Sequence, residues 1–218
     1  MESMKARRER AGEIATVLAG WYPDDLRCAL DFENPYQLLV KTILAAQCTD
    51  KKVNEISPAL FARWPDPASL AAAPLPEIEK MVRQTGFFRA KAASIRKCSQ
   101  ALVERHGGVV PRTMEGLNAL PGVGRKTANV LLTNVFGVPG IVVDTHVLRV
   151  AGRLGLSRET DAEKVEADLM RLLPEAEWSA FCHRLTWLGR RVCDARKPRC
   201  VECRLRPVCP TGRKLTGT

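Results

Sequence analysis

The stretch Leu120-Pro121-Gly122-Val123-Gly124-Arg125-Lys126-Thr127-Ala128 decides the fold. Here Pro-Gly-x-Gly interrupts an apolar helical stripe, and the spacing predicts a second helix from Lys126 to Phe136. Gly122 and Gly124 carry no side chain, so backbone N–H groups at the start of that helix can approach a phosphate closely. The same residues would also make a plain tight connection between two helices. Arg125 and Lys126 beside the turn favour phosphate binding.

Outward from this stretch, apolar residues recur at helical spacing along nearly the whole chain. Asn34-Pro35 has the pattern of a helix start, with Asn as the cap and Pro at the first helical position. Later stripes include Val147, Val150 and Leu154, and the strand-like run 141–143 is too short to build a sheet. The sequence therefore predicts an all-α fold of many short helices.

Length and charge narrow the function further. The 218 residues suffice for one or two domains at about 150 residues each. Lys plus Arg exceed Asp plus Glu by 34 − 24 = 10, which favours an anionic partner such as nucleic acid, although a basic surface can also serve solubility alone. No apolar run reaches the ~20 residues that span a membrane. We expect no signal peptide, no membrane partner and a cytoplasmic location.

Four of the eight cysteines crowd together near the C-terminus in the pattern Cys193-x6-Cys200-x2-Cys203-x5-Cys209. In a reducing compartment such a group is typical of metal binding. Structural zinc usually takes two separated Cys-x2-Cys pairs, whereas this segment has one pair with longer arms. The spacing favours an iron-sulfur cluster and leaves zinc, or cysteines without a metal, as alternatives.

Lys126 and Asp144 are the candidates for chemistry. A lysine is a nucleophile when it is neutral, and burial beside a cationic groove would lower its pKa and favour that form. A carboxylate could orient the amine and move protons. Asp144-Thr145-His146 precedes a helix, however, so Asp144 is also a natural helix N-cap, and Lys126 alone is typical of a solvated helix residue.

Together, the motif 120–129, Val143-Asp-Thr-His146 and the four-cysteine pattern resemble the endonuclease III family of helix-hairpin-helix DNA glycosylases. The resemblance begins at Leu44-Ala-Ala-Gln-Cys-Thr-Asp50 and extends to Cys209. It implies a six-helix barrel domain over residues 28–138, and an iron-sulfur domain made of 1–27 and 139–218. It also implies a [4Fe-4S] cluster on Cys193, Cys200, Cys203 and Cys209, with double-stranded DNA in the groove between the domains.

By the same resemblance, Lys126 is the nucleophile and Asp144 the activating carboxylate of a bifunctional glycosylase and AP lyase. Such an enzyme excises oxidised pyrimidines through a Schiff base and nicks 3′ to the abasic site by β-elimination. The damaged base must be flipped out of the stack, and a filler takes its place. The resemblance assigns DNA contacts to Gln47, to a wedge at Phe87 and Phe88, to Gly122, Val123, Gly124 and Arg125, and to His146, for which a packed, hydrogen-bonded role is an equal alternative.

Two positions depart from the family pattern. Phe87-Phe88 stands where an aliphatic and a tyrosine-like residue are expected, and Cys48 stands where Ala or Thr is typical. These changes concern the choice of lesion.

Rival interpretations are a monofunctional mismatch-type glycosylase, a non-catalytic DNA-structure binding protein and a ferredoxin-type electron carrier. Because no exposed apolar heptad or strand edge is visible, we expect a monomer.

Overall fold

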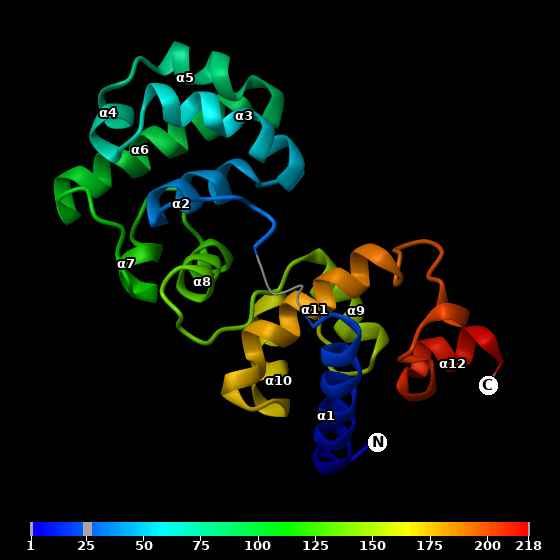
Figure 1. Cartoon of the computed structure of the whole chain (residues 1–218). Coiled ribbons are helices and arrows are strands. Elements are labelled where there is room, and N and C mark those ends of the chain that lie inside the picture. Colours follow the sequence, from blue (N-terminus) through cyan, green and yellow to red (C-terminus); the bar gives the residue numbers. More distant parts are fainter. Residues whose placement is uncertain (1, 24–27, 218) are drawn as a thin grey trace. The chain divides into compact units, whose positions relative to one another are not determined.

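The computed structural model describes residues 2–23 and 28–217 of the chain. Within these residues the chain forms helices joined by short loops, without a strand, and the all-α prediction is confirmed (Figure 1). The chain divides into two compact units. We call Cys28–Val138 the central unit, and Met1–Arg27 with Pro139–Thr218 the terminal unit. The sequence predicted a domain boundary between residues 27 and 28. Residues 24–27, on one side of this boundary, lie outside the described part of the chain.

The central unit has its own apolar core, built from one face of each of its helices. Helix α6 (Phe88–His106) packs against α2 (Pro35–Leu44), α4 (Pro67–Ala72) and α5 (Leu75–Val82). The remaining helical segments of the unit are α3 (Asp50–Arg63), η1 (Arg83–Thr85), α7 (Met114–Asn118) and α8 (Arg125–Asn134). Helix α2 also contacts α3 and α8, so it lies at the middle of this unit.

Side-chain caps place the starts of these helices. Asn34, directly before Pro35, accepts a hydrogen bond from the backbone N–H of Gln37 through its side chain, as the sequence pattern predicts. Thr49 and Asp66 cap α3 and α4 in the same way. Helix α8 begins one residue earlier and ends two residues earlier than the spacing predicts, because the backbone of Gly124 takes the cap position and the chain leaves the helix after Asn134.

The terminal unit joins the two ends of the chain around a second apolar core. Helix α11 (Trp178–Arg191) contacts both α1 (Met4–Trp21) and α9 (Thr145–Arg153). The other helical segments are α10 (Ala162–Leu172), η2 (Glu175–Glu177), η3 (Cys200–Glu202), η4 (Arg206–Val208) and α12 (Pro210–Thr216). None of the described helices has the length and apolar character needed to cross a membrane.

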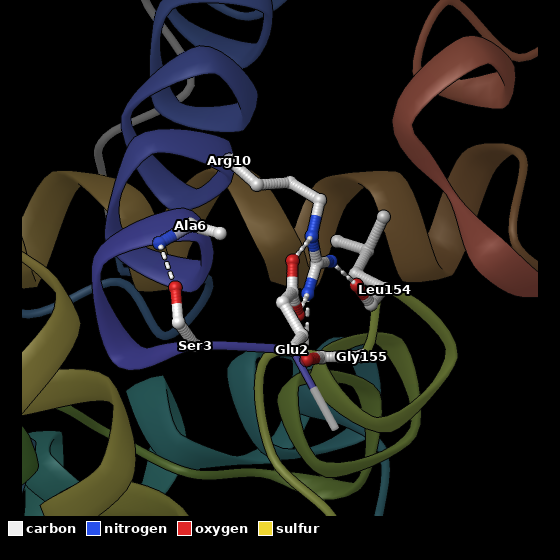
Figure 2. Close-up of polar contacts among 6 residues, drawn as sticks. All are labelled: Glu2, Ser3, Ala6, Arg10, Leu154 and Gly155. Carbon is white, nitrogen blue, oxygen red and sulfur yellow. Dashed lines mark hydrogen bonds and ion pairs between the residues drawn. The ribbon is translucent and has the colours of Figure 1, made fainter.

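Arg10 links α1 to the end of α9 (Figure 2). Its guanidinium donates to the carbonyl oxygens of Leu154 and Gly155, the latter at 3.0 Å, and pairs with the Glu2 carboxylate at 2.7 Å. Hydrogen bonding to Arg10 lowers the pKa of the Glu2 carboxyl. A single arginine therefore satisfies carbonyl groups at a helix end that have no partner within the helix.

Candidate functional site

The hairpin between α7 and α8 is shaped by its glycines. Gly122 has a φ of +78°, which an L side chain seldom adopts, and a Cβ there would lie 3.1 Å from the Cβ of Ser94. Val123 is buried, and its N–H donates to the Leu120 carbonyl at 3.2 Å. Gly124 caps α8 without a side chain. The first N–H groups of α8 thus have no intrahelical acceptor and no side-chain cap, which is the arrangement that binds anions.

Lys126 is the second residue of α8, and its side chain is exposed. The expectation that the protein itself buries this amine is wrong. At the start of α8 the apolar face that enters the core begins with Ala128, so residues 125 and 126 point away from the core. The amine is accessible to a ligand that lies against the hairpin.

Two exposed loop tips of the central unit carry a non-glycine residue in the left-handed conformation. Gln47, between α2 and α3, has a φ of +52°, and Phe87, directly before α6, has a φ of +46°. The Phe87 side chain is 69% exposed, whereas Phe88 is half-buried and packs against the core. Such backbone outliers cost free energy and cluster at functional sites. We call residues 45–49 the Gln47 tip and residues 85–87 the Phe87 tip.

The hairpin and both tips share the same supporting helices. A Cβ on Gly122 would meet Ser94 of α6 and, at 3.9 Å, Ile43 of α2. Ile43 lies at the end of α2 that leads into the Gln47 tip, and Ser94 lies in the half of α6 that follows the Phe87 tip. The central unit therefore brings together the hairpin, Lys126 and both tips.

Asp144, in the terminal unit, is the N-cap of α9, as its sequence context predicts. One carboxylate oxygen accepts from the Val147 N–H at 2.7 Å. The other accepts from the Thr186 hydroxyl of α11 at 3.3 Å. The cap leaves the carboxylate half-buried and held in one orientation, which is compatible with a further role in chemistry.

Two histidines lie near this carboxylate. Burial lowers the pKa of His146 and of His183, and the negative charge of Asp144 opposes the shift at both. His146 Nδ1 is 3.1 Å from an Arg149 nitrogen that also donates to the Gly189 carbonyl. A Cβ on Gly189 would lie 2.8 Å from that of His146. His146 is therefore packed and hydrogen-bonded in the structure, and its contact with DNA stays a prediction.

The four clustered cysteines line one pocket in the terminal unit. The other walls include apolar residues of α9 and α11 and at their ends, together with arginine side chains: Val150, Leu154, Leu188, Arg153, Arg199 and Arg206. Among the residues that the structure describes, no three or more His, Cys, Asp or Glu side chains converge on a single metal ion. Thiolates spread around a pocket suit a cluster with several irons, each able to take its own sulfur.

Hydrogen bonds already point at these sulfur atoms. Gly212 N–H donates to Cys209 Sγ at 3.2 Å, and the Arg153 guanidinium lies 3.2 Å from Cys193 Sγ. Burial raises the pKa of Cys203 to about 11 and also raises that of Cys209. Buried sulfurs of this kind become thiolates when a metal provides positive charge, so donor set and surroundings both fit an iron-sulfur cluster.

Sequence reasoning missed the arginines that hold this segment. Arg153 donates to the carbonyl oxygens of Asp194 and Ala195, both at 2.6 Å, and Arg149 donates to that of Cys193 at 3.2 Å. The sequence did contain a signal for these arginines, because Arg149 and Arg153 stand four residues apart, on one face of the helix that Asp144 begins. Their partners, 40 or more residues away, could not be read from the spacing.

Comparison with known proteins agrees with this geometry. Residues 40–175 match the family model of the HhH-GPD superfamily base excision DNA repair proteins. The endonuclease III of Synechocystis sp. is 48% identical over 97% of this chain and 96% of its own length. That of Bacillus subtilis is 46% identical over 86% of each chain.

Solved structures give the same result. A trapped endonuclease III–DNA covalent intermediate superposes with a TM-score of 0.90 at 40% identity, covering 99% of this chain and 100% of that one. A thermostable thymine-DNA glycosylase, 22% identical, shares the fold with a TM-score of 0.85 over 94% of this chain and 98% of its own. By the sequence matches and the family model, the chain belongs to the endonuclease III family, the DNA glycosylase/AP lyases of base excision repair within the HhH-GPD superfamily.

Proposed function

We propose that this protein excises oxidised pyrimidines from duplex DNA and nicks the abasic site, with the Lys126 amine as nucleophile. The observation that carries the proposal is the exposed Lys126 side chain at the second position of α8, a helix that begins after Gly124 without a side-chain cap and whose N-terminus favours a phosphate. DNA held on the hairpin would lie against this amine. The protein acts on nucleoid DNA in the cytoplasm, as a monomer.

The reaction follows from amine chemistry. The neutral amine forms a bond to C1′ of the damaged nucleotide as the bond from C1′ to the base breaks, and the base leaves with a proton. Opening of the sugar ring gives an iminium that acidifies the C2′ proton. Loss of that proton expels the 3′-phosphate, so the strand breaks without water. One relative was solved as a trapped covalent intermediate with DNA, which supports a covalent step here.

Asp144 is the proposed proton carrier and orienting carboxylate. Val147 N–H and the Thr186 hydroxyl occupy one position on each of its oxygens. Each carboxylate oxygen retains a further lone pair for the amine or the sugar. His146 is proposed to support α9 beside the DNA backbone, with Arg149 holding its ring.

The two tips are the proposed base-flipping elements. An enzyme of this class reaches its target only after the nucleotide leaves the stack, and the vacated space needs a side chain. Gln47 and Phe87 are exposed, at loop tips, with backbone conformations that hold them away from the core. Phe88 forms the base of the wedge by packing against the core.

Cys193, Cys200, Cys203 and Cys209 are the proposed ligands of a [4Fe-4S] cluster, and members of this family carry an iron-sulfur cluster. When bound, the cluster supplies negative charge balanced by the pocket arginines, and it organises the segment 193–212. The arginines of this segment and Lys197 would contact DNA phosphates.

A nicking assay tests the proposal. Lys126→Gln should still bind a duplex with one thymine glycol, yet neither release the base nor nick the strand. Lys97→Gln, a change at an exposed lysine of α6, should behave as the unaltered chain. Nicking by Lys126→Gln at the unaltered rate would overturn the nucleophile assignment. Base release without nicking by the unaltered chain would favour a monofunctional glycosylase.

A further inference from the structure

Lys91 is a buried lysine whose amine donates to main-chain carbonyls and not to a carboxylate. Its side chain lies in α6, and the residue is only 5% exposed. The amine donates to the Leu44 carbonyl at 2.8 Å and to the Thr85 carbonyl at 2.7 Å. Burial lowers the pKa of the Lys91 amine. Burying this group is costly, and the cost is offset by its two carbonyl acceptors.

Both acceptors stand at the base of an exposed tip. Leu44 is the last residue of α2 and leads into the Gln47 tip, and the helix ends there because Cys48 N–H bonds the Ala45 carbonyl instead. The Leu44 carbonyl is therefore one of the helix-end acceptors that need a partner from elsewhere. Thr85 directly precedes Gly86 and Phe87.

Lys91 donates two hydrogen bonds to the Phe87 tip, of which only the side-chain bond depends on the residue being a lysine. Its backbone N–H donates to the Phe87 carbonyl at 3.1 Å, while its side-chain amine reaches back to the Thr85 carbonyl. The residues between these carbonyls, Gly86 and Phe87, both have positive φ angles. A turn in which consecutive residues adopt this conformation is costly, and it persists when its surroundings determine it.

We propose that Lys91 is a positioning residue that ties the Gln47 tip and the Phe87 tip into one unit, so that both enter the DNA stack together. The inference rests on the proposed function of the tips in base flipping. The tie runs through main-chain carbonyls, so it holds the backbone of each tip and leaves both side chains free to contact DNA. A surface hydrogen bond from Lys52 of α3 to Gln84 of η1, at 3.2 Å, joins the segments next to the two tips and adds less.

Hydrogen-deuterium exchange without DNA gives a readout that does not depend on activity. Lys91→Met, of similar length but without donors, should speed amide exchange about tenfold in both tips at once. The matched control is Lys41→Met, because Lys41 is also 5% exposed and also donates to a backbone carbonyl, that of Asp31. It should leave both tips unchanged. Faster exchange in one tip only, or in neither, would overturn the tie.

A double-mutant cycle tests the coupling during repair. The measured quantity is the single-turnover rate of excision from a fully paired duplex. With Lys91 present, the rate loss of the Gln47→Ala/Phe87→Ala double variant should differ about tenfold from the product of the two single losses. In the Lys91→Met chain they should become additive. Lys91→Met should slow that excision about tenfold but nick a preformed abasic site within about threefold of the unaltered rate, because an abasic site lacks a base to unstack. Additive effects with Lys91 present would overturn the proposal.

Two further arms keep the outcomes separate. Lys91→Arg, whose guanidinium can donate to both carbonyls, should restore slow exchange and non-additivity. If Lys91→Met does not fold, Lys91→Gln takes its place, and its shorter amide should speed exchange in both tips to a smaller extent. If the unaltered chain neither excises nor nicks, the proposed function fails, while the exchange experiment still decides whether Lys91 ties the tips.

Discussion

Asp144 is the N-cap of α9, and its geometry also leaves room for the proposed role in chemistry. Its cap hydrogen bond to Val147 fixes the start of α9, and its bond from Thr186 restrains the second oxygen. A carboxylate that already accepts two hydrogen bonds is preoriented before substrate arrives. Its position in the fold therefore serves both helix stability and the proposed chemistry.

Thr186→Val tests how far that orientation matters. Valine keeps the shape of threonine but removes the donor, so one carboxylate hydrogen bond worth about 1 kcal/mol is lost. We expect about a fivefold fall in the single-turnover excision rate, with little change in DNA affinity. Thr186→Ser, which retains the hydroxyl, should stay close to the unaltered rate. Equal rates for the valine variant and the unaltered chain would contradict an orienting role.

The hairpin between α7 and α8 shows how far local sequence predicts an element. Pro-Gly-x-Gly predicted the turn and the start of α8 to within one residue, because glycine conformations and caps are local properties. The left-handed backbone of Gln47 and Phe87 could not be predicted, because these residue types seldom adopt it without tertiary contacts. The ties from Lys91 and Arg153 span dozens of residues and leave no periodic trace.

Alanine substitutions at the two hairpin glycines should affect stability and DNA binding differently. Gly122→Ala should lower the free energy of unfolding by about 1–2 kcal/mol, because its φ is +78° and the new Cβ meets Ser94. Gly124 has a negative φ, and a Cβ there would have nothing within 4 Å. The free energy of unfolding should therefore fall by less in Gly124→Ala than in Gly122→Ala. If phosphate approaches the α8 N-terminus, the new methyl should still weaken DNA binding. Denaturant unfolding and DNA titration measure the two effects, and unchanged DNA affinity in Gly124→Ala would contradict phosphate binding there.

The whole molecule consists of a central unit that carries the hairpin and a terminal unit that carries the cysteine pocket. The motifs that allowed family assignment lie in both, and the excess of ten positive charges suits DNA as the common partner. The cysteine spacing indicated a metal site, and the structure brings all four cysteines to one pocket. The pocket walls from α9 and α11 depend on tertiary packing that spacing does not encode.

Cys203→Ala tests the cluster at this level. Removing one of four ligands should abolish the visible absorption and the bound iron, and it should destabilise the segment 193–212. The control is Cys182→Ala in the core of the same unit, a buried cysteine outside the pocket, which should keep its iron despite some loss of packing. A stable, colourless and fully active Cys203→Ala protein would contradict the proposed role of the cluster.

The most direct test of the central claim is borohydride trapping on a duplex that carries one thymine glycol, with the attachment site mapped by peptide mass. The account predicts a covalent protein–DNA product attached at Lys126, because borohydride reduces the Schiff base to a stable amine. Lys126→Gln should give none. A product attached at another residue, or none with either the thymine glycol or an abasic duplex, would contradict Lys126 as the nucleophile.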